Sequence, residues 1–379
     1  MNQKSIAKIN PKILKWAREQ CGFTHQEAVG SYLNPKKLEE AEKGRVFLTF
    51  NQLLTIANKY ERNPAFFYLD HIPQEDLIDD FRTPGSMKVK YSPELRKTII
   101  NIKEKHKLAV EFKNYDKDYD YSYINSINLN HNIVDVSKKI SNLLNINPLE
   151  IKSWNNKYSA LKGWVRAFES IGILIFQLTG ISIEEMRAFS ISETPFPVIS
   201  LNRSDSPLGR IFSLIHELCH LMLEKGGICT YNHDDEAHFN IEKFCNAVAG
   251  EVLVPTSSLL NQKIIINHGF SKIWSEAELK SLGKIYWASN EVILRRLLTS
   301  NLTSKNFYQE MREKWKKRVS KTTAFGEQGH LKVLRTNSPN FIKIVLNAMY
   351  DNKILMTDVS YYLDISLKYF NNLVKNFET

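Results

Sequence analysis

Two histidines four residues apart, with a glutamate directly after the first, lie inside a stretch that is apolar on nearly every side. These residues are His216, Glu217 and His220. A serine and a proline at 206–207 predict the start of a helix, and the glycine pair at 226–227 predicts its end. The apolar residues between them cover almost the whole circumference of such a helix, which indicates that it is buried.

Burial makes this motif chemically demanding, because an uncompensated charge inside a protein costs several kcal/mol. Residues i and i+4 lie on the same face of a helix, so His216 and His220 are placed to hold one metal ion. Glu217 lies about 100° around the helix, within reach of a water bound to that ion. The alternative is a pair of core histidines that hydrogen bonds alone satisfy.

A catalytic metal site of this kind needs a third protein ligand and one open position. Residues 241–255 read as a second buried helix that ends at a proline, and Glu242 lies on its stripe of small residues. We therefore predict that Glu242 faces the first helix as a ligand. Glu251 lies nearly opposite and is predicted to be solvated or to act as a secondary hydrogen-bonding group. Weaker ligand candidates precede this helix: His233, Asp234, Asp235 and His238.

The segments 210–220, 242–246 and 253–255 together resemble the ImmA/IrrE family of zinc metallopeptidases. Residues 186–192 and 197–202 look like the strands that precede the zinc helix of that family. The resemblance implies that His216, His220 and Glu242 bind Zn2+ and that Glu217 is the catalytic carboxylate. It departs at Cys219, where the family usually has a small residue, and we interpret this thiol as a packing group.

A mechanism follows from these roles. Zinc would lower the pKa of its bound water, and Glu217 would take the proton and later pass it to the leaving amine. We expect the strand at 197–201 to pair with an extended substrate peptide. An oxyanion donor cannot be assigned, although Tyr231, His233 and His238 lie in the relevant stretch. The same ligand set would also accept manganese or iron.

Composition limits the class of protein. A chain of 379 residues has room for two or three domains, and its net charge of +10 favours an acidic or nucleic-acid partner. The cysteines Cys21, Cys219, Cys229 and Cys245 are widely spaced, so a disulfide framework is not expected. Neither an apolar signal core nor a stretch long enough to span a membrane is present in the sequence. We therefore expect a cytoplasmic protein without a membrane partner.

The first 72 residues are predicted to form a bundle of helices that resembles the Xre/Cro-type helix-turn-helix domain. Its second motif helix would present Lys36 and Lys37 to DNA, but it also carries Glu39, Glu40 and Glu42, which repel phosphates. DNA is thus one possible partner of residues 1–72. The alternative is a degenerate module that contacts protein.

The expected fold class is α+β and mostly helical, with a zincin-like peptidase domain around a small sheet. The predicted domains are residues 1–72 (helix-turn-helix domain), 73–127 (linker and long helix), 128–265 (metallopeptidase domain), 266–320 (helix-turn-helix-like module) and 321–379 (C-terminal helical module). In the module at 266–320, Arg295 and Arg296 lie on the second helix; a plain packing role for that module is the alternative to DNA binding. Residues 114–132 are predicted to form a surface loop.

The sequence therefore predicts a cytoplasmic zinc endopeptidase with a protein substrate. The resemblance implies that this substrate is a helix-turn-helix repressor, whose cleavage controls stress-response or mobile-element genes. Two alternatives remain. One is a DNA-binding regulator in which the peptidase fold is a sensor or secondary, and the other is the protease partner of a toxin–antitoxin or phage-response pair.

Overall fold

The computed structural model describes residues 5–60, 62–72, 92–113, 119–223, 235–316 and 329–378. The chain divides into two compact units, Met1–Lys107 and Leu108–Thr379. Helices dominate both units, and each contains one small sheet. The predicted α+β class with mostly helical content is therefore confirmed, while the five domain boundaries stay predictions.

Local capping signals set the helices of the first unit. Its elements are β1 (Ile6–Ala7), α1 (Pro11–Gln20), α2 (His25–Val29), α3 (Pro35–Glu42), β2 (Leu48–Thr49), α4 (Phe50–Lys59) and η1 (Pro64–Tyr68), and helix α5 (Pro93–Glu111) contains the boundary between the units. A capping box of Thr24 and Glu27 is present at the start of α2. The first 72 residues thus contain helices, as expected, whereas the two short paired strands were not anticipated.

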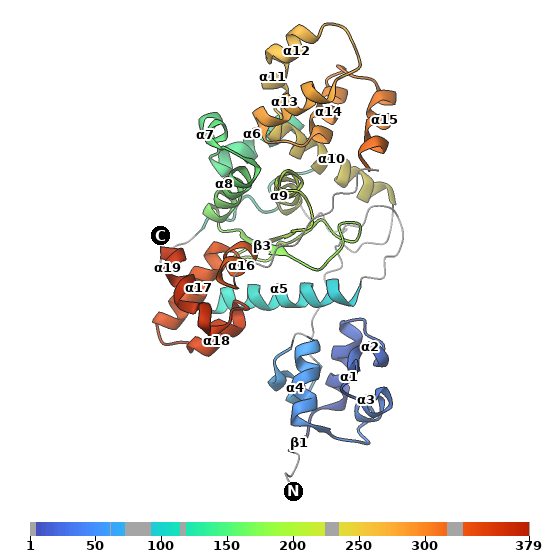
Figure 1. Cartoon of the computed structure of the whole chain (residues 1–379), viewed down its shortest axis with the longest axis vertical. Coiled ribbons are helices and arrows are strands. Elements are labelled where there is room, and N and C mark those ends of the chain that lie inside the picture. Colours follow the sequence, from blue (N-terminus) through green and yellow to red (C-terminus); the bar gives the residue numbers. More distant parts are fainter. Residues whose placement is uncertain are drawn as a thin grey trace. The chain divides into compact units, whose positions relative to one another are not determined.

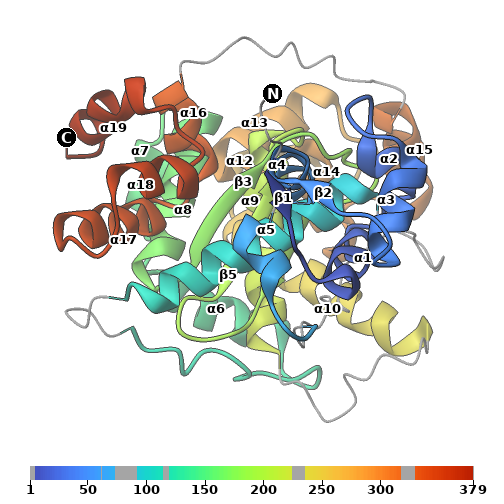
Figure 2. The same cartoon turned by 90° about the horizontal axis from the view of Figure 1, so that it is seen from below.

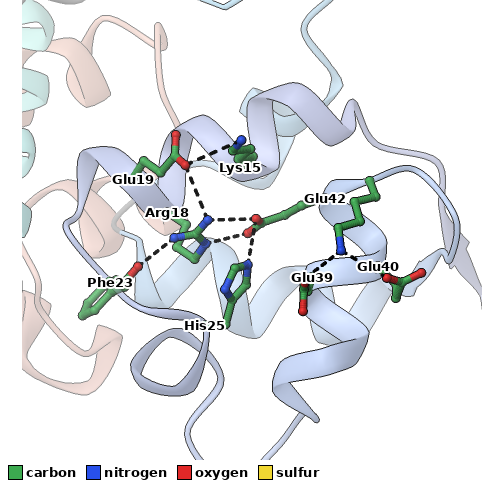
Figure 3. A network of polar contacts seen from close by, with 9 residues as sticks. Lys15, Arg18, Glu19, Phe23, His25, Glu39, Glu40 and Glu42 are labelled. Atoms are coloured by element: carbon green, nitrogen blue, oxygen red, sulfur yellow. Dashed lines mark hydrogen bonds and ion pairs between the residues drawn. The ribbon is translucent and has the colours of Figure 1, made fainter.

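A buried ion pair joins three of these helices (Figure 3). The Arg18 guanidinium on α1 donates to both carboxylate oxygens of Glu42 on α3, at 2.7 and 2.9 Å. His25 Nε2, at the start of α2, lies 3.1 Å from the same carboxylate. The side chains of Arg18 and Glu42 are only 9% and 4% exposed, so each charge depends on the other for compensation.

The acidic side chains on the outer surface of α3 are paired with basic residues that follow the helix. Lys43 contacts Glu39 and Glu40, and Arg45 contacts Glu40. Lys37 Nζ donates to Gln52 on α4 at 3.0 Å. Glu39 and Glu40 therefore offset the charges of Lys43 and Arg45, which would otherwise attract phosphates, whereas Lys37 bonds to a neutral amide.

The second unit is built from one long series of elements. They are α6 (Ile133–Leu144), α7 (Pro148–Ser153), α8 (Lys157–Ser170), β3 (Leu174–Leu178), β4 (Ala188–Ile191), β5 (Val198–Asn202), α9 (Pro207–Met222), α10 (Asp235–Leu253), α11 (Thr256–Leu260), α12 (Lys263–His268), α13 (Glu276–Tyr286), α14 (Asn290–Thr299), α15 (Lys305–Lys316), α16 (Gly329–Thr336), α17 (Pro339–Tyr350), α18 (Met356–Tyr362), η2 (Leu367–Tyr369) and α19 (Phe370–Glu378). Within the described residues, no helix has the length and apolar character needed to span a membrane.

The three-stranded sheet has the order β3-β5-β4, with β3 parallel and β4 antiparallel to β5. Strand β5 is therefore hydrogen-bonded on both sides. Our expectation that residues 197–201 would pair with a substrate is wrong, because no backbone edge remains for a peptide to join. Strand β4 lies at the edge of the sheet, and its pairing within the described residues is with β5 alone.

Helix α9 lies over one face of this sheet and packs on its other side against α10 (Figure 1). Helix α8 contacts both α9 and β3, and α6 supports α10. The C-terminal helices α16–α19 form one group (Figure 2). This group meets β3 through an edge-to-face contact of Phe176 with Phe341, whose ring centroids are 5.5 Å apart.

A buried carboxylate on α8 also joins the C-terminal group to the sheet. Glu169 accepts hydrogen bonds from the backbone N–H groups of Ile175 on β3 and Asn340 on α17, each at 2.9 Å. The Asn340 side chain donates in turn to the backbone oxygen of Glu169 at 2.8 Å. Burial raises the pKa of Glu169 to about 7, although the hydrogen bonds that it accepts favour the charged form.

Helix α14 uses one of its two adjacent arginines for packing. Arg296 is 6% exposed and donates to the carboxylate of Glu251 and to the backbone oxygen of Val254. The Arg295 guanidinium lies over the ring of Tyr308 on α15, 5.0 Å from the centroid. These contacts favour the packing interpretation of the pattern at 266–320 over the DNA-binding one.

We predict that Arg18→Met destabilises the first unit by about 3 kcal/mol, because it leaves a buried carboxylate without its cation. Hydrogen exchange of the full chain, followed by mass spectrometry on peptides from α1 and α3, measures this change. Lys15→Met is the matched control, since the pair of Lys15 with Glu19, at 3.9 Å, is exposed. That control should cost less than about 1 kcal/mol. Equal exchange in both variants would contradict the role given to the buried pair.

A second prediction concerns pH. The folded pKa of Glu169, about 7, lies above its ordinary value of 4.5, so the folded chain holds this proton more tightly than the unfolded chain. The stability of wild type relative to Glu169→Gln should therefore fall as pH rises from about 4.5 to 7, by about 3 kcal/mol in total. Urea unfolding of both chains between pH 5 and 8 gives this difference. A difference that does not change with pH would refute the prediction.

Candidate metal centre

The start of helix α9 agrees with the sequence prediction, but its end does not. Its start is as predicted: Ser206 Oγ accepts from the N–H of Gly209 at 3.0 Å, and Pro207 is the first helical residue. Its end is earlier than predicted, at Met222, with Leu223 already extended. The expected stop at 226–227 lies outside the described residues.

A segment that was expected to be a surface loop terminates α9. Asn125 and Ile127 donate backbone N–H groups to the carbonyls of Leu221 and Met222, at 3.1 and 3.0 Å. Tyr123 and Ile127 are 4% and 1% exposed, so this part of residues 114–132 belongs to the core and the loop prediction is wrong there. Residues 114–118 lie outside the described part of the chain. The pairing fixes the end of the helix two residues beyond His220.

The motif itself is enclosed. From Ile211 to Met222, every residue of α9 except Phe212 and His220 is buried. His216 and Glu217 are each 3% exposed. The sequence prediction of a buried helix around the motif is therefore confirmed.

The three predicted metal ligands converge between α9 and α10. One potential ligand atom from each of His216, His220 and Glu242 lies within 4.8 Å of the others. Nε2 of His216 is 3.7 Å from Oε2 of Glu242, and Nε2 of His220 is 3.5 Å from Oε1. Donor atoms that share a tetrahedral zinc ion lie about 3.4 Å apart, given bond lengths near 2.1 Å.

The donor set fits a metal ion better than a hydrogen-bonded pair of core histidines. Neither ring nitrogen of the buried His216 makes a hydrogen bond with a described residue, and 3.7 Å to the carboxylate is too long for one. The side chains become more exposed across the group, from 4% for His216 to 19% for His220 and 25% for Glu242. Such a group would hold an ion on a buried side and leave a position open toward solvent.

Glu217 points toward the sheet. Its Oε2 accepts a hydrogen bond from Ser190 Oγ on β4 at 2.9 Å. This contact was not anticipated, because it joins residues 27 positions apart and depends on the register of β4. A serine in a short strand before the motif is too weak a signal to have found it.

The remaining described residues that the sequence suggested for the site are not part of the group formed by His216, His220 and Glu242. Glu251 is 5% exposed and accepts from Thr256 N–H at 2.8 Å and from Thr256 Oγ1 at 2.7 Å, besides Arg296. It is thus a buried hydrogen-bonding group, as one of our two interpretations held, and is not solvated. Cys219 is buried, as expected for a packing group. The side chains of Tyr231, His233, Asp234, Asp235 and His238 lie outside the described residues.

One protein family matches the segment of the chain that contains this centre. No curated protein matches the chain. Residues 168–264, which include His216, Glu217, His220 and Glu242, match the model of the peptidase family M78, described as the IrrE N-terminal-like domain. The match supports a metallopeptidase domain of the ImmA/IrrE type in this part of the chain.

Proposed function

We propose that this protein is a zinc-dependent endopeptidase whose active site lies between α9 and α10. The convergence of His216, His220 and Glu242, with the buried Glu217 next to His216 on α9, is the observation that carries the proposal. Two imidazoles and one carboxylate are a common ligand set of catalytic zinc, and the matched family supports peptide hydrolysis as the reaction.

A zinc ion held here would supply the Lewis acidity that activates a water and polarises the scissile carbonyl. Glu217 would accept the proton of the attacking water and then donate it to the departing amine. His216, His220 and Glu242 would keep the metal in place without taking part in the proton transfer.

We place the substrate peptide along β4. Among the described residues no further strand pairs with its outer edge, and Ser190 on the same strand contacts the proposed proton acceptor. An extended peptide could add to this edge by main-chain hydrogen bonds.

We further propose that the substrate is a regulatory protein of the helix-turn-helix type, on the basis of the family resemblance. The first unit is proposed to contact protein rather than DNA, because Glu39 and Glu40 on α3 offset the charges of Lys43 and Arg45. A role as a DNA-binding regulator remains the second candidate, and Lys36 and Lys37 are its best test.

The metal assignment predicts that His216→Ala, His220→Ala and Glu242→Ala each reduce zinc from about one ion per chain to well below half of that. Elemental analysis of the purified full chain measures this content. His131→Ala is the matched control, because His131 hydrogen-bonds to Asn128 in the segment before α6 and should leave the zinc content unchanged. Full zinc in the Glu242 variant would exclude this residue as the third ligand.

The enzyme and DNA-binding proposals predict different mutant behaviour. Glu217→Gln should slow cleavage of a co-expressed Xre-type repressor at least about 100-fold, while zinc stays bound. A double charge reversal, Lys36→Glu with Lys37→Glu, should leave cleavage intact. The assay follows the repressor on a gel and transcription from its promoter. Cleavage that survives Glu217→Gln, with regulation lost only in the lysine variant, would overturn the enzyme proposal.

A further inference from the structure

The face of the sheet that α9 covers is apolar except at two positions. Strand register places six side chains on this face: Ile175, Gln177, Ala188, Ser190, Ile199 and Leu201. The four apolar members belong to the same hydrophobic core as α9. The two polar members lie on the two edge strands, Gln177 on β3 and Ser190 on β4.

Both polar side chains bond to α9. Gln177 Oε1 accepts from the guanidinium of Arg210, and Ser190 Oγ donates to Oε2 of Glu217 at 2.9 Å. Arg210 and Glu217 are seven residues apart, almost two full turns, and so lie on one stripe of the helix. Of these two contacts, only the one from Ser190 reaches the histidine–glutamate motif.

The hydroxyl of Ser190 is well suited to hold a carboxylate. A hydroxyl on an otherwise apolar face is costly unless it is hydrogen-bonded, and a bond to an ionised oxygen is stronger than one between neutral groups. The bond starts from a strand that pairs with β5 over four residues, so its donor is fixed by backbone structure. Solvent cannot play this part, since Glu217 is 3% exposed.

We propose that Ser190 is a positioning residue for Glu217: its hydroxyl sets the orientation in which the carboxylate exchanges a proton at the metal centre. This inference rests on the proposed function of the site. Ser190 acts through Glu217 and not on the reacting atoms. The strand proposed to align the substrate would then also orient the proton acceptor, so that both are set by one element.

Binding of acetohydroxamic acid to the zinc-loaded full chain tests this role without a known substrate. This chelator gives up an acidic proton as it binds zinc, and a carboxylate in the orientation of Glu217 favours its binding by accepting that proton. We expect Ser190→Ala to weaken the affinity about tenfold, measured by titration calorimetry. Ser190→Thr keeps the hydroxyl and suits a strand, so its affinity should stay within about twofold of wild type.

Two comparisons separate positioning from a general loss of structure. Gln177→Met removes the matched polar contact to α9 at Arg210 and should leave the affinity for acetohydroxamic acid unchanged. In a chain that already carries Glu217→Gln, adding Ser190→Ala should have no further effect, because the group that Ser190 orients is gone.

The possible failures are distinguishable by zinc content. A wild-type chain that binds no zinc would overturn both the proposed function and the role of Ser190. Equal zinc with equal affinity in wild type and Ser190→Ala would overturn only the role of Ser190. The role of Ser190 would also be overturned if Ser190→Thr bound acetohydroxamic acid as weakly as Ser190→Ala. So would it be if Ser190→Ala lowered the affinity by the same factor in the Glu217→Gln chain as in wild type.

Discussion

The burial of ionisable side chains on one apolar helix is the constraint on which the second unit depends. Helix α9 is covered by the sheet on one side and by α8 and α10 on others, yet it carries Arg210, His216, Glu217 and His220. A charge in such a place needs a compensating group, or the helix is destabilised by several kcal/mol. The sheet supplies Gln177 and Ser190, and α10 supplies Glu242. The positions of β3, β4 and α10 around the helix therefore bury its apolar side chains and also supply partners for its polar ones.

Much of this could be predicted, because the relevant signals are local. The apolar circumference around His216, the serine–proline start of α9 and the stripe that carries Glu242 are each visible within about 16 residues of sequence. Helix periodicity converts such patterns directly into faces. The capping box at Thr24 was predictable for the same reason, as it depends on residues three apart.

What the sequence did not reveal depends on long-range register. Ser190 meets Glu217 only because β4 pairs with β5 in one register; a slip of one residue would turn this side chain to the other face. The segment that ends α9 acts through backbone N–H groups, which leave no side-chain signature, and its polar composition suggested a surface loop. The role of Arg296 also depends on a distant residue. Two adjacent arginines on a helix suggest a solvated surface, but the fold brings Glu251, 45 residues earlier in the sequence, into contact with Arg296.

The charged groups of the two units have different surroundings. In the first unit, the buried pair of Arg18 and Glu42 stabilises the bundle, and Glu39 and Glu40 on α3 offset the charges of Lys43 and Arg45. The net charge of +10 is therefore a property of the whole chain that cannot be assigned to this helix as a DNA-binding surface. In the second unit, exposure increases from His216 to Glu242, so the metal group is closed toward the core and accessible on one side. The residues of the motif set the chemistry of the site, but their burial leaves them little surface with which to recognise a partner. Selection of a partner therefore depends on surfaces that the motif does not include, such as the outer edge of β4, which pairs with no further strand of the described residues.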